Sequence, residues 1–319
     1  MALRPTFVLS LDTELVWGSF DICSPATFQA RYPEIRTVIK GILDALVDHE
    51  MAATWAVVGH LFLDSCGRGP DGRAHPELAR PDLRWHPGDW FAADPCTDRA
   101  RDPLWYGDDI VDLLLGAGVA QEIGSHSFAH IPFGDEGCTP EVVETDLTAC
   151  TKLAAQRGLA LRSFVFPRNS EGHHAALAEH GFVAYRGLDP TWFESFPGQA
   201  SRAARLVDQA VPVPPPVSTP TETLPGLWNI PGSMLLIGRR GLRRVVPPAA
   251  TVAKARAGMA RAVREGKVFH LWFHPFNLAA DRERSLAMFR AILAEAARLR
   301  DAGALEVRTM GDLAAALSA

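Results

Sequence analysis

Two acidic residues, Asp12 and Glu14, follow an apolar run at residues 6–11. Such a run is typical of a buried strand, and side chains two positions apart on a strand point to the same face. The two carboxylates are therefore predicted to project together from the C-terminal end of a buried strand. Paired negative charge is costly there unless a cation or a proton-transfer role compensates for it.

Two histidines, His126 and His130, are separated by three residues. On a helical turn this spacing directs both rings to the same side, where they could bind one metal ion. Two histidines and one carboxylate form a common catalytic zinc set that leaves coordination positions open for water and substrate. The alternative is two unrelated surface or core histidines, because this spacing alone is weak evidence for a metal.

Polar residues recur where predicted strands end. They are Asp12 and Glu14 after 6–11, His126 and His130 after 120–124, Arg168 after 163–166, and His274 after 268–273. Barrels and open α/β sheets place their active sites at the C-terminal ends of parallel strands. This combination favours a metal-dependent active site over unrelated coincidences.

Strand-like and helix-like segments alternate along the chain, which predicts an α/β architecture with parallel strands. The remaining predicted strands are 53–58 and 182–185, and the predicted helices are 34–50, 107–115, 140–156, 174–180, 251–265 and 281–300. We find no internal repeat and no clean domain boundary. We therefore expect a single domain over residues 1–319, with insertions near 63–106 and 195–247.

The composition excludes several classes of protein. The chain of 319 residues has 47% hydrophobic and 22% charged residues, as is ordinary for a globular enzyme. Its net charge of −5 argues against a general nucleic-acid binder. The N-terminus lacks the pattern of a secretory signal, and no apolar stretch is long enough for a transmembrane segment. With five scattered cysteines, we expect a cytoplasmic protein with reduced thiols.

Four segments, in this order, resemble motifs of the polysaccharide deacetylase family, which comprises NodB-homology domains and carbohydrate esterase family four. They are SLDTE at 10–14, HSFAH at 126–130, RSFVFPRN at 162–169 and LWFHP at 271–275. The resemblance covers nearly the whole chain. It implies a distorted (β/α) barrel, usually with about seven parallel strands, and metal-dependent hydrolysis of an N-acyl group from an amino sugar.

The sequence departs from the family pattern at three points. The common first motif has adjacent aspartates, whereas Thr13 stands next to Asp12; the Asp-x-acid pattern instead resembles intracellular deacetylase and deformylase members. Arg168 follows Pro167, although the common order places arginine before proline. Asp189 with Trp192 is only a loose match to the family's Asp-Trp motif.

The resemblance assigns a role to each candidate residue. Glu14, His126 and His130 would bind a divalent metal, most readily Zn²⁺, with Co²⁺, Ni²⁺ or Fe²⁺ as alternatives. The metal would activate water and polarise the amide carbonyl. Asp12 would accept the water proton, Arg168 would keep Asp12 ionised and oriented, and His274 would protonate the leaving amine.

The expected substrate is an N-acylated amino sugar, which a lipid or nucleotide could carry. Trp85, Trp90 and Trp105 of the first insertion, together with Asn169, are candidate substrate contacts. The tryptophans could equally form a small core that lets this long loop fold. The arginines within 239–244 could meet a carrier phosphate, although a solvated basic turn is slightly favoured.

Two other functions remain open on the sequence. One is hydrolysis of a small non-sugar amide, and the other is a catalytically silent carbohydrate-binding protein. The joint presence of Asp12, Glu14, both spaced histidines and His274 argues against the silent form. His270 lies on the same strand face as His274, and we expect it to be a buried, hydrogen-bonded histidine rather than a second acid.

Overall fold

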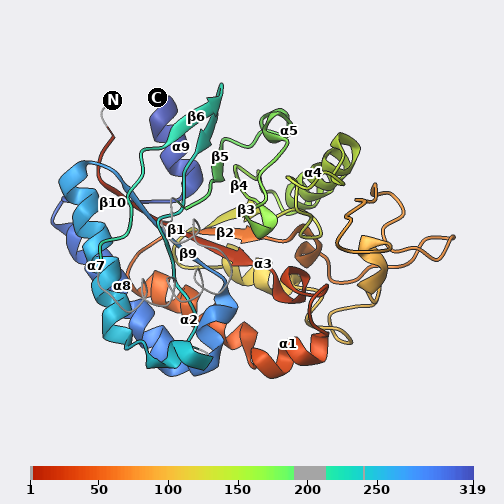
Figure 1. Ribbon diagram of the computed structural model, residues 1–319, viewed down its shortest axis with the longest axis horizontal. Coiled ribbons are helices and arrows are strands. Elements are labelled where there is room, and N and C mark those ends of the chain that lie inside the picture. The colour runs from red at the N-terminus through yellow and green to blue at the C-terminus, as the bar shows by residue number, and fades with distance from the viewer. Residues whose placement is uncertain (1–2, 190–212, 240) are drawn as a thin grey trace.

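The computed structural model describes residues 3–189, 213–239 and 241–319 (Figure 1). In this part of the chain, a ten-stranded, mostly parallel sheet has the order β6-β7-β5-β4-β3-β2-β1-β9-β8, and β10 also pairs with β1. The strands are β1 (Thr6–Thr13), β2 (Thr54–Val57), β3 (Glu122–Ser125), β4 (Ser163–Val165), β5 (Ala184–Arg186), β6 (Thr221–Leu224), β7 (Leu227–Asn229), β8 (Met234–Leu235), β9 (Val268–Phe273) and β10 (Glu306–Arg308).

Helices surround the sheet (Figure 1): most cover its outer face, whereas the C-terminal helix packs against Val8, Ala56 and Val165 of the opposite face. They are α1 (Pro25–Arg31), α2 (Ile35–Asp48), α3 (Asp108–Leu115), α4 (Pro140–Gln156), α5 (His174–Glu179), α7 (Pro248–Glu265), α8 (Arg282–Asp301) and α9 (Met310–Ser318). The apolar residues of α2 recur at helical spacing and are buried, and α2 and α7 both pack against α8. These contacts fix the outer layer around the strands.

The central strand is β1, which is buried along its whole length. It pairs in parallel with β9 on one side, and with β10 and then β2 on the other. A continuous apolar run suits a strand that is covered on both faces, as in parallel sheets. The acidic end of β1 therefore lies within the C-terminal edge of the sheet, between β2 and β9.

Residues 227–235 connect the two ends of the parallel sheet. β7 pairs with β5, and β8 pairs with β9. Between them, the Ile230 N–H donates to the carbonyl of Tyr185 at 2.9 Å, and the Ser233 N–H donates to that of His270 at 2.9 Å. The sheet is therefore curled into a distorted (β/α) half-barrel, which confirms the predicted fold class.

The long segment 63–106 has little regular structure but is well packed. It contains a 3-10 helix at Trp90–Ala93 and an antiparallel bridge between Ser65 and Asp98. Trp90 and Tyr106 are buried, so aromatic side chains give this long loop a packed interior. The second expected insertion, 195–247, lies partly outside the described residues.

Candidate active site at the C-terminal end of the sheet

Five of the residues selected from the sequence come together beyond the end of β1. Glu14 Oε1 lies 3.1 Å from His126 Nε2, 3.2 Å from His130 Nε2 and 3.2 Å from His274 Nε2. Asp12 Oδ2 lies 3.7 Å from the same His274 nitrogen. Both carboxylates are buried, and His274 is partly exposed. The site therefore combines paired acids with three imidazoles.

His126 and His130 lie on a tight turn rather than on the expected helical turn. Ser127 and His130 have φ angles of 63° and 58°, in the left-handed region that non-glycine residues seldom adopt. The buried carboxylate of Asp146, on α4, accepts hydrogen bonds from the Ser127 hydroxyl at 2.7 Å and the Phe128 N–H at 2.9 Å. Strained backbone of this kind needs support from its surroundings, which Asp146 provides. Burial raises the pKa of Asp146 to about 6.

The rings of His126 and His130 both direct their Nε2 atoms toward Glu14. His126 Nδ1 lies 2.7 Å from the carbonyl oxygen of Val165, which can only accept, so Nδ1 carries the proton. The Nε2 lone pair of His126 therefore faces the Glu14 carboxylate. His130 Nδ1 is buried without a hydrogen-bond partner among the described residues. The Nε2 atoms of both histidines thus converge on one carboxylate, an arrangement that suits a cation.

The charges of the site perturb one another. Burial raises the pKa of Glu14, but His274 and His130 outweigh it and hold this pKa well below its usual range. Burial lowers the pKa of His274, yet the Glu14 and Asp12 carboxylates outweigh it and raise the value. For His130, burial dominates and lowers the pKa. Neighbouring groups are thus driven toward different protonation states, as at many active sites.

Arg186, and not Arg168, holds Asp12. Its Nη1 and Nη2 donate to the two oxygens of Asp12 at 2.6 and 2.7 Å, and both side chains are buried. Burial raises the pKa of Asp12, but Arg186 outweighs it and lowers the value. Arg168 instead binds Asp21 at 2.6 Å and stacks over Trp85. The expectation that Arg168 orients Asp12 is therefore wrong.

The sequence contained a signal for Arg186. Arg186 is the last residue of β5, whereas the predicted strand 182–185 ends one residue earlier. The rule that selected Arg168, a polar residue at the end of a predicted strand, applies equally to Arg186. Arg168 was the expected partner because it lies in the segment 162–169, which resembles a family motif, whereas Arg186 lies in none of the four matched segments.

A buried network supports Arg186 from behind. Arg186 donates to the Ser10 hydroxyl at 3.0 Å, and Ser10 lies 2.8 Å from His270 Nε2. His270 Nδ1 lies 3.1 Å from the carbonyl oxygen of Ile230, so it carries the proton and Nε2 accepts from Ser10. Burial lowers the pKa of His270 to about 3. His270 is therefore a buried, hydrogen-bonded residue, as predicted.

Trp272 packs against the same arginine. The Arg186 guanidinium lies 4.0 Å from the centroid of the Trp272 ring. Trp272 Nε1 in turn donates to Asp189 at 2.8 Å. The residue that was loosely matched with Asp189, Trp192, lies outside the described residues.

Two of the candidate substrate contacts are buried. Trp90 and Trp105 are only 1% and 4% exposed. Trp90 Nε1 donates to the carbonyl of Ala129 at 2.8 Å, and Trp105 packs edge-on against Trp17. These two tryptophans belong to the core of the insertion, which corrects the expectation that they contact substrate.

Trp85 and Asn169 remain at the surface. Trp85 is 46% exposed and donates to Asp135 at 2.8 Å. Asn169 is exposed and has a φ of 52°. Their role in substrate binding stays a prediction.

The basic cluster is partly occupied by internal contacts. Arg239 donates to Asp281 at 3.3 Å and also to the backbone carbonyls of Val246 and Arg244. Residue 240 lies outside the described part of the chain. Arg239 therefore holds its own segment together, which does not support a role in binding a carrier phosphate.

No helix among the described residues is long and apolar enough to cross a membrane.

Comparison with known proteins gives matches at the level of structure. No protein-family model and no curated protein sequence matches the chain. A solved structure described as a polysaccharide deacetylase from Mycobacterium smegmatis has a TM-score of 0.61 and 16% identity, covering 99% of this chain and 91% of that one.

Two further structures superpose nearly as well. The allantoinase PuuE has a TM-score of 0.58 and 12% identity, covering 98% of this chain and 90% of that one. A probable polysaccharide deacetylase from Pseudomonas aeruginosa PAO1 has the same TM-score, identity and coverage. The chain thus has the polysaccharide deacetylase fold over nearly its whole length.

Proposed function

We propose that the protein is a hydrolase of the polysaccharide deacetylase family, which uses a divalent metal to remove an N-acyl group from an amino sugar. The observation that carries this proposal is the convergence of Glu14, His126 and His130 beside Asp12 and His274. The deacetylase fold places this group at the edge of the sheet where α/β enzymes bind their substrates.

The three proposed ligands suit a metal ion. One donor atom from each of Glu14, His126 and His130 lies within 4.8 Å of the others, and all three residues are buried. The hydrogen bond from His126 Nδ1 to Val165 is the type of outer contact that orients metal-binding histidines. Such a set suits Zn²⁺, and Co²⁺, Ni²⁺ or Fe²⁺ as well. When bound, the metal would polarise the acyl carbonyl and lower the pKa of the attacking water.

Asp12 is suited to be the general base. Its lowered pKa keeps it ionised at neutral pH. Arg186 fixes the plane of the carboxylate through two hydrogen bonds, and each oxygen keeps a further lone pair. Asp12 can therefore take a proton from the water that attacks the acyl carbon.

His274 is suited to be the general acid. Its Nε2 lies 3.7 Å from Asp12 Oδ2, and this carboxylate raises the pKa of His274 and favours the protonated ring. It is partly exposed, whereas the two carboxylates are buried. An amine is a poor leaving group until it is protonated, and His274 can supply that proton.

A second candidate is hydrolysis of a small non-sugar amide. The likeness to the allantoinase favours it, because that structure superposes as well as one of the two deacetylases. The same acid, base and metal set would serve either reaction. The two candidates differ in the substrate and not in the chemistry.

The test is hydrolysis by the purified protein after reconstitution with Zn²⁺ or Co²⁺, measured as release of acetate or formate from the N-acyl sugars and as ring opening of allantoin. The substrates are N-acetylglucosamine, its short oligomers, its nucleotide-linked form, the corresponding N-formyl sugars, and allantoin. We expect turnover of at least one N-acyl sugar and none of allantoin. Turnover of allantoin alone would favour the second candidate, and no turnover of any N-acyl sugar would contradict the proposal.

A further inference from the structure

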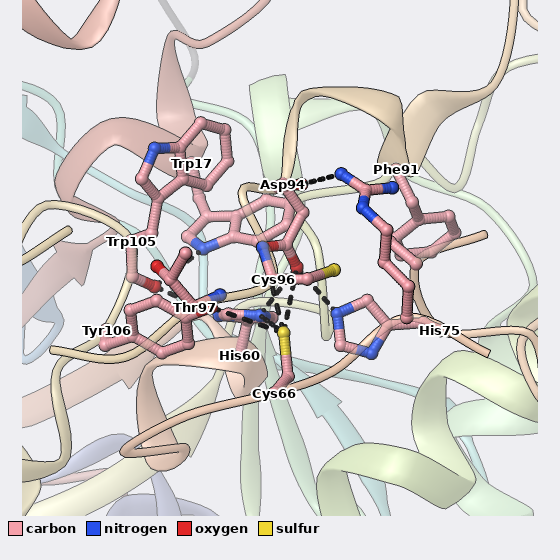
Figure 2. A network of polar contacts seen from close by, with 12 residues as sticks. Trp17, His60, Cys66, His75, Phe91, Asp94, Cys96, Thr97, Trp105 and Tyr106 are labelled. Carbon is pink, nitrogen blue, oxygen red and sulfur yellow. Dashed lines mark hydrogen bonds and ion pairs between the residues drawn. The ribbon is translucent and has the colours of Figure 1, made fainter. Parts of the chain in front are cut away.

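A second group of metal-ligand side chains lies outside the candidate active site. His60, on the 3-10 helix Gly59–Phe62 after β2, meets Cys66, His75 and Asp94 of the 63–106 insertion (Figure 2). One donor atom from each of these four residues lies within 4.8 Å of the others. This group has no signature in the sequence, because the four residues are irregularly spaced and only the fold of the insertion brings them together.

The distances within the group are close to those around a tetrahedral zinc ion. Asp94 Oδ2 lies 2.9 Å from His60 Nε2, 2.7 Å from His75 Nε2 and 3.6 Å from Cys66 Sγ. Cys66 Sγ lies 3.8 Å from His60 Nε2. Zn–N and Zn–O bonds of about 2.0 Å and a Zn–S bond of about 2.3 Å would place N and O ligands about 3.3 Å apart, and sulfur about 3.5 Å from them. Shifts of a few tenths of an ångström would therefore admit the ion.

The hydrogen bonds of His60 leave a conflict that a cation would remove. Its Nδ1 lies 3.0 Å from the carbonyl oxygen of Trp105, so Nδ1 carries the proton of the neutral ring. Its Nε2 lone pair then faces the Asp94 carboxylate. Both side chains are fully buried, where two facing acceptors are costly. An ion between them would be bound by both.

The surroundings resemble the outer shell of a structural metal site. The Cys96 N–H donates to Asp94 Oδ1 at 2.8 Å, which orients the carboxylate and leaves Oδ2 facing the histidines. The Tyr106 hydroxyl lies 3.3 Å from Cys66 Sγ. The ring of Trp17 lies 4.6 Å from that of His60, and the ring of Phe128 lies 5.1 Å from that of His75. Aromatic side chains therefore cover the site.

We propose that His60, Cys66, His75 and Asp94 bind a zinc ion that fastens the 63–106 insertion to the barrel. Two imidazoles, a thiolate and a carboxylate complete four-coordination, so the site would be closed and structural. Cys66 would bind as the thiolate and release its proton to solvent. The proposal of this site does not rest on the proposed deacylase activity.

The proposed zinc site adjoins the turn that carries the active-site histidines. The His60 N–H donates to the carbonyl of Phe128 at 2.8 Å, and the Gly59 N–H donates to that of Ser127 at 2.8 Å. Three of the four ligands come from a segment with little regular structure, which a metal would hold in place. The ion would therefore also brace the turn at 126–130.

The test is a titration of the metal-free, full-length protein with Co²⁺, followed by absorption spectroscopy. A thiolate bound to Co²⁺ gives a charge-transfer band in the near ultraviolet. The candidate active site supplies only nitrogen and oxygen ligands, so this band reports the second site alone. We expect the band in the wild type and in the His126→Ala/His130→Ala variant, and we expect Cys66→Ser to lose it.

Cys96→Ser is the matched control, because Cys96 belongs to the same loop but not to the four-residue set. We expect it to keep the band, whereas His75→Gln should weaken Co²⁺ binding at the second site by at least about tenfold. A wild-type protein without the band would overturn the proposal, and so would a band that survives Cys66→Ser. If Cys66→Ser does not fold, the wild type and the His126→Ala/His130→Ala variant still decide, because the proposal requires the band in both.

Discussion

The ionised state of Asp12 depends on Arg186, whose guanidinium binds both of its oxygens. Arg186→Met would leave a buried carboxylate unpaired, which costs about 3–5 kcal/mol of unfolding free energy. We also expect kcat/KM to fall at least about 100-fold, and its acidic limb to move to higher pH, because the pKa of Asp12 would rise.

Arg168→Met is the matched control for this prediction. Arg168 binds Asp21 and Trp85 rather than Asp12. We expect the acidic limb of the kcat/KM profile of Arg168→Met to stay at the wild-type pH. If Arg168→Met moves that limb and Arg186→Met does not, Arg186 is not the partner that keeps Asp12 ionised.

His270 makes the protein sensitive to acid. Burial lowers its folded-state pKa to about 3, whereas the unfolded chain has an ordinary value of about 6.5. Between these two values the unfolded state binds the extra proton. This residue's contribution to stability is therefore complete above about pH 6.5 and falls as the pH decreases toward 3, by at most about 1.4 kcal/mol per pH unit.

Denaturant unfolding at several pH values checks this contribution. In His270→Gln, an amide can still donate and accept hydrogen bonds but does not titrate. We expect its unfolding free energy to fall less steeply below pH 6.5 than that of the wild type. Equal slopes in the two proteins would exclude His270 as the source of the acid sensitivity.

At the scale of the element, the turn at 126–130 depends on α4. Asp146→Ala would leave the Ser127 hydroxyl and the Phe128 N–H without their buried acceptor. We expect a loss of about 2–4 kcal/mol in unfolding free energy, together with weaker metal binding at the candidate active site. The exposed Glu144, on the same helix, is the control, and Glu144→Ala should change stability by no more than about 0.5 kcal/mol.

Long helices could be predicted closely from the sequence, whereas several short strands could not. α2 and α4 lie within two residues of their predicted bounds because their apolar periodicity extends over several turns, and Thr139 caps α4. β7, β8 and β10 have only two or three residues each, so pairing with other strands is their only signature. The turn at 126–130 was misread as helical because spacing alone does not distinguish a helix from a left-handed turn.

At the scale of the whole molecule, the barrel gathers residues that are far apart in the sequence. Asp12 and Glu14 meet His274 because β1 and β9 are parallel neighbours in register. This meeting could be anticipated, since the C-terminal ends of parallel strands share one edge of a sheet. The contact of Arg186 with Asp12 joins side chains of two strands that are not neighbours in the sheet. The group around Asp94 forms because a long loop folds back onto the barrel. Neither follows from strand order alone.

The most direct test of the proposed activity compares the wild type with Asp12→Asn in a single assay of bound metal and acyl release. We expect both proteins to bind the metal at Glu14, His126 and His130, and only the wild type to release acetate or formate from an N-acyl amino sugar. Asp12→Asn should be at least about 100-fold slower. Turnover by Asp12→Asn at the wild-type rate would contradict the assignment of Asp12 as the base, and a wild type that binds no metal at these residues would contradict the mechanism as a whole.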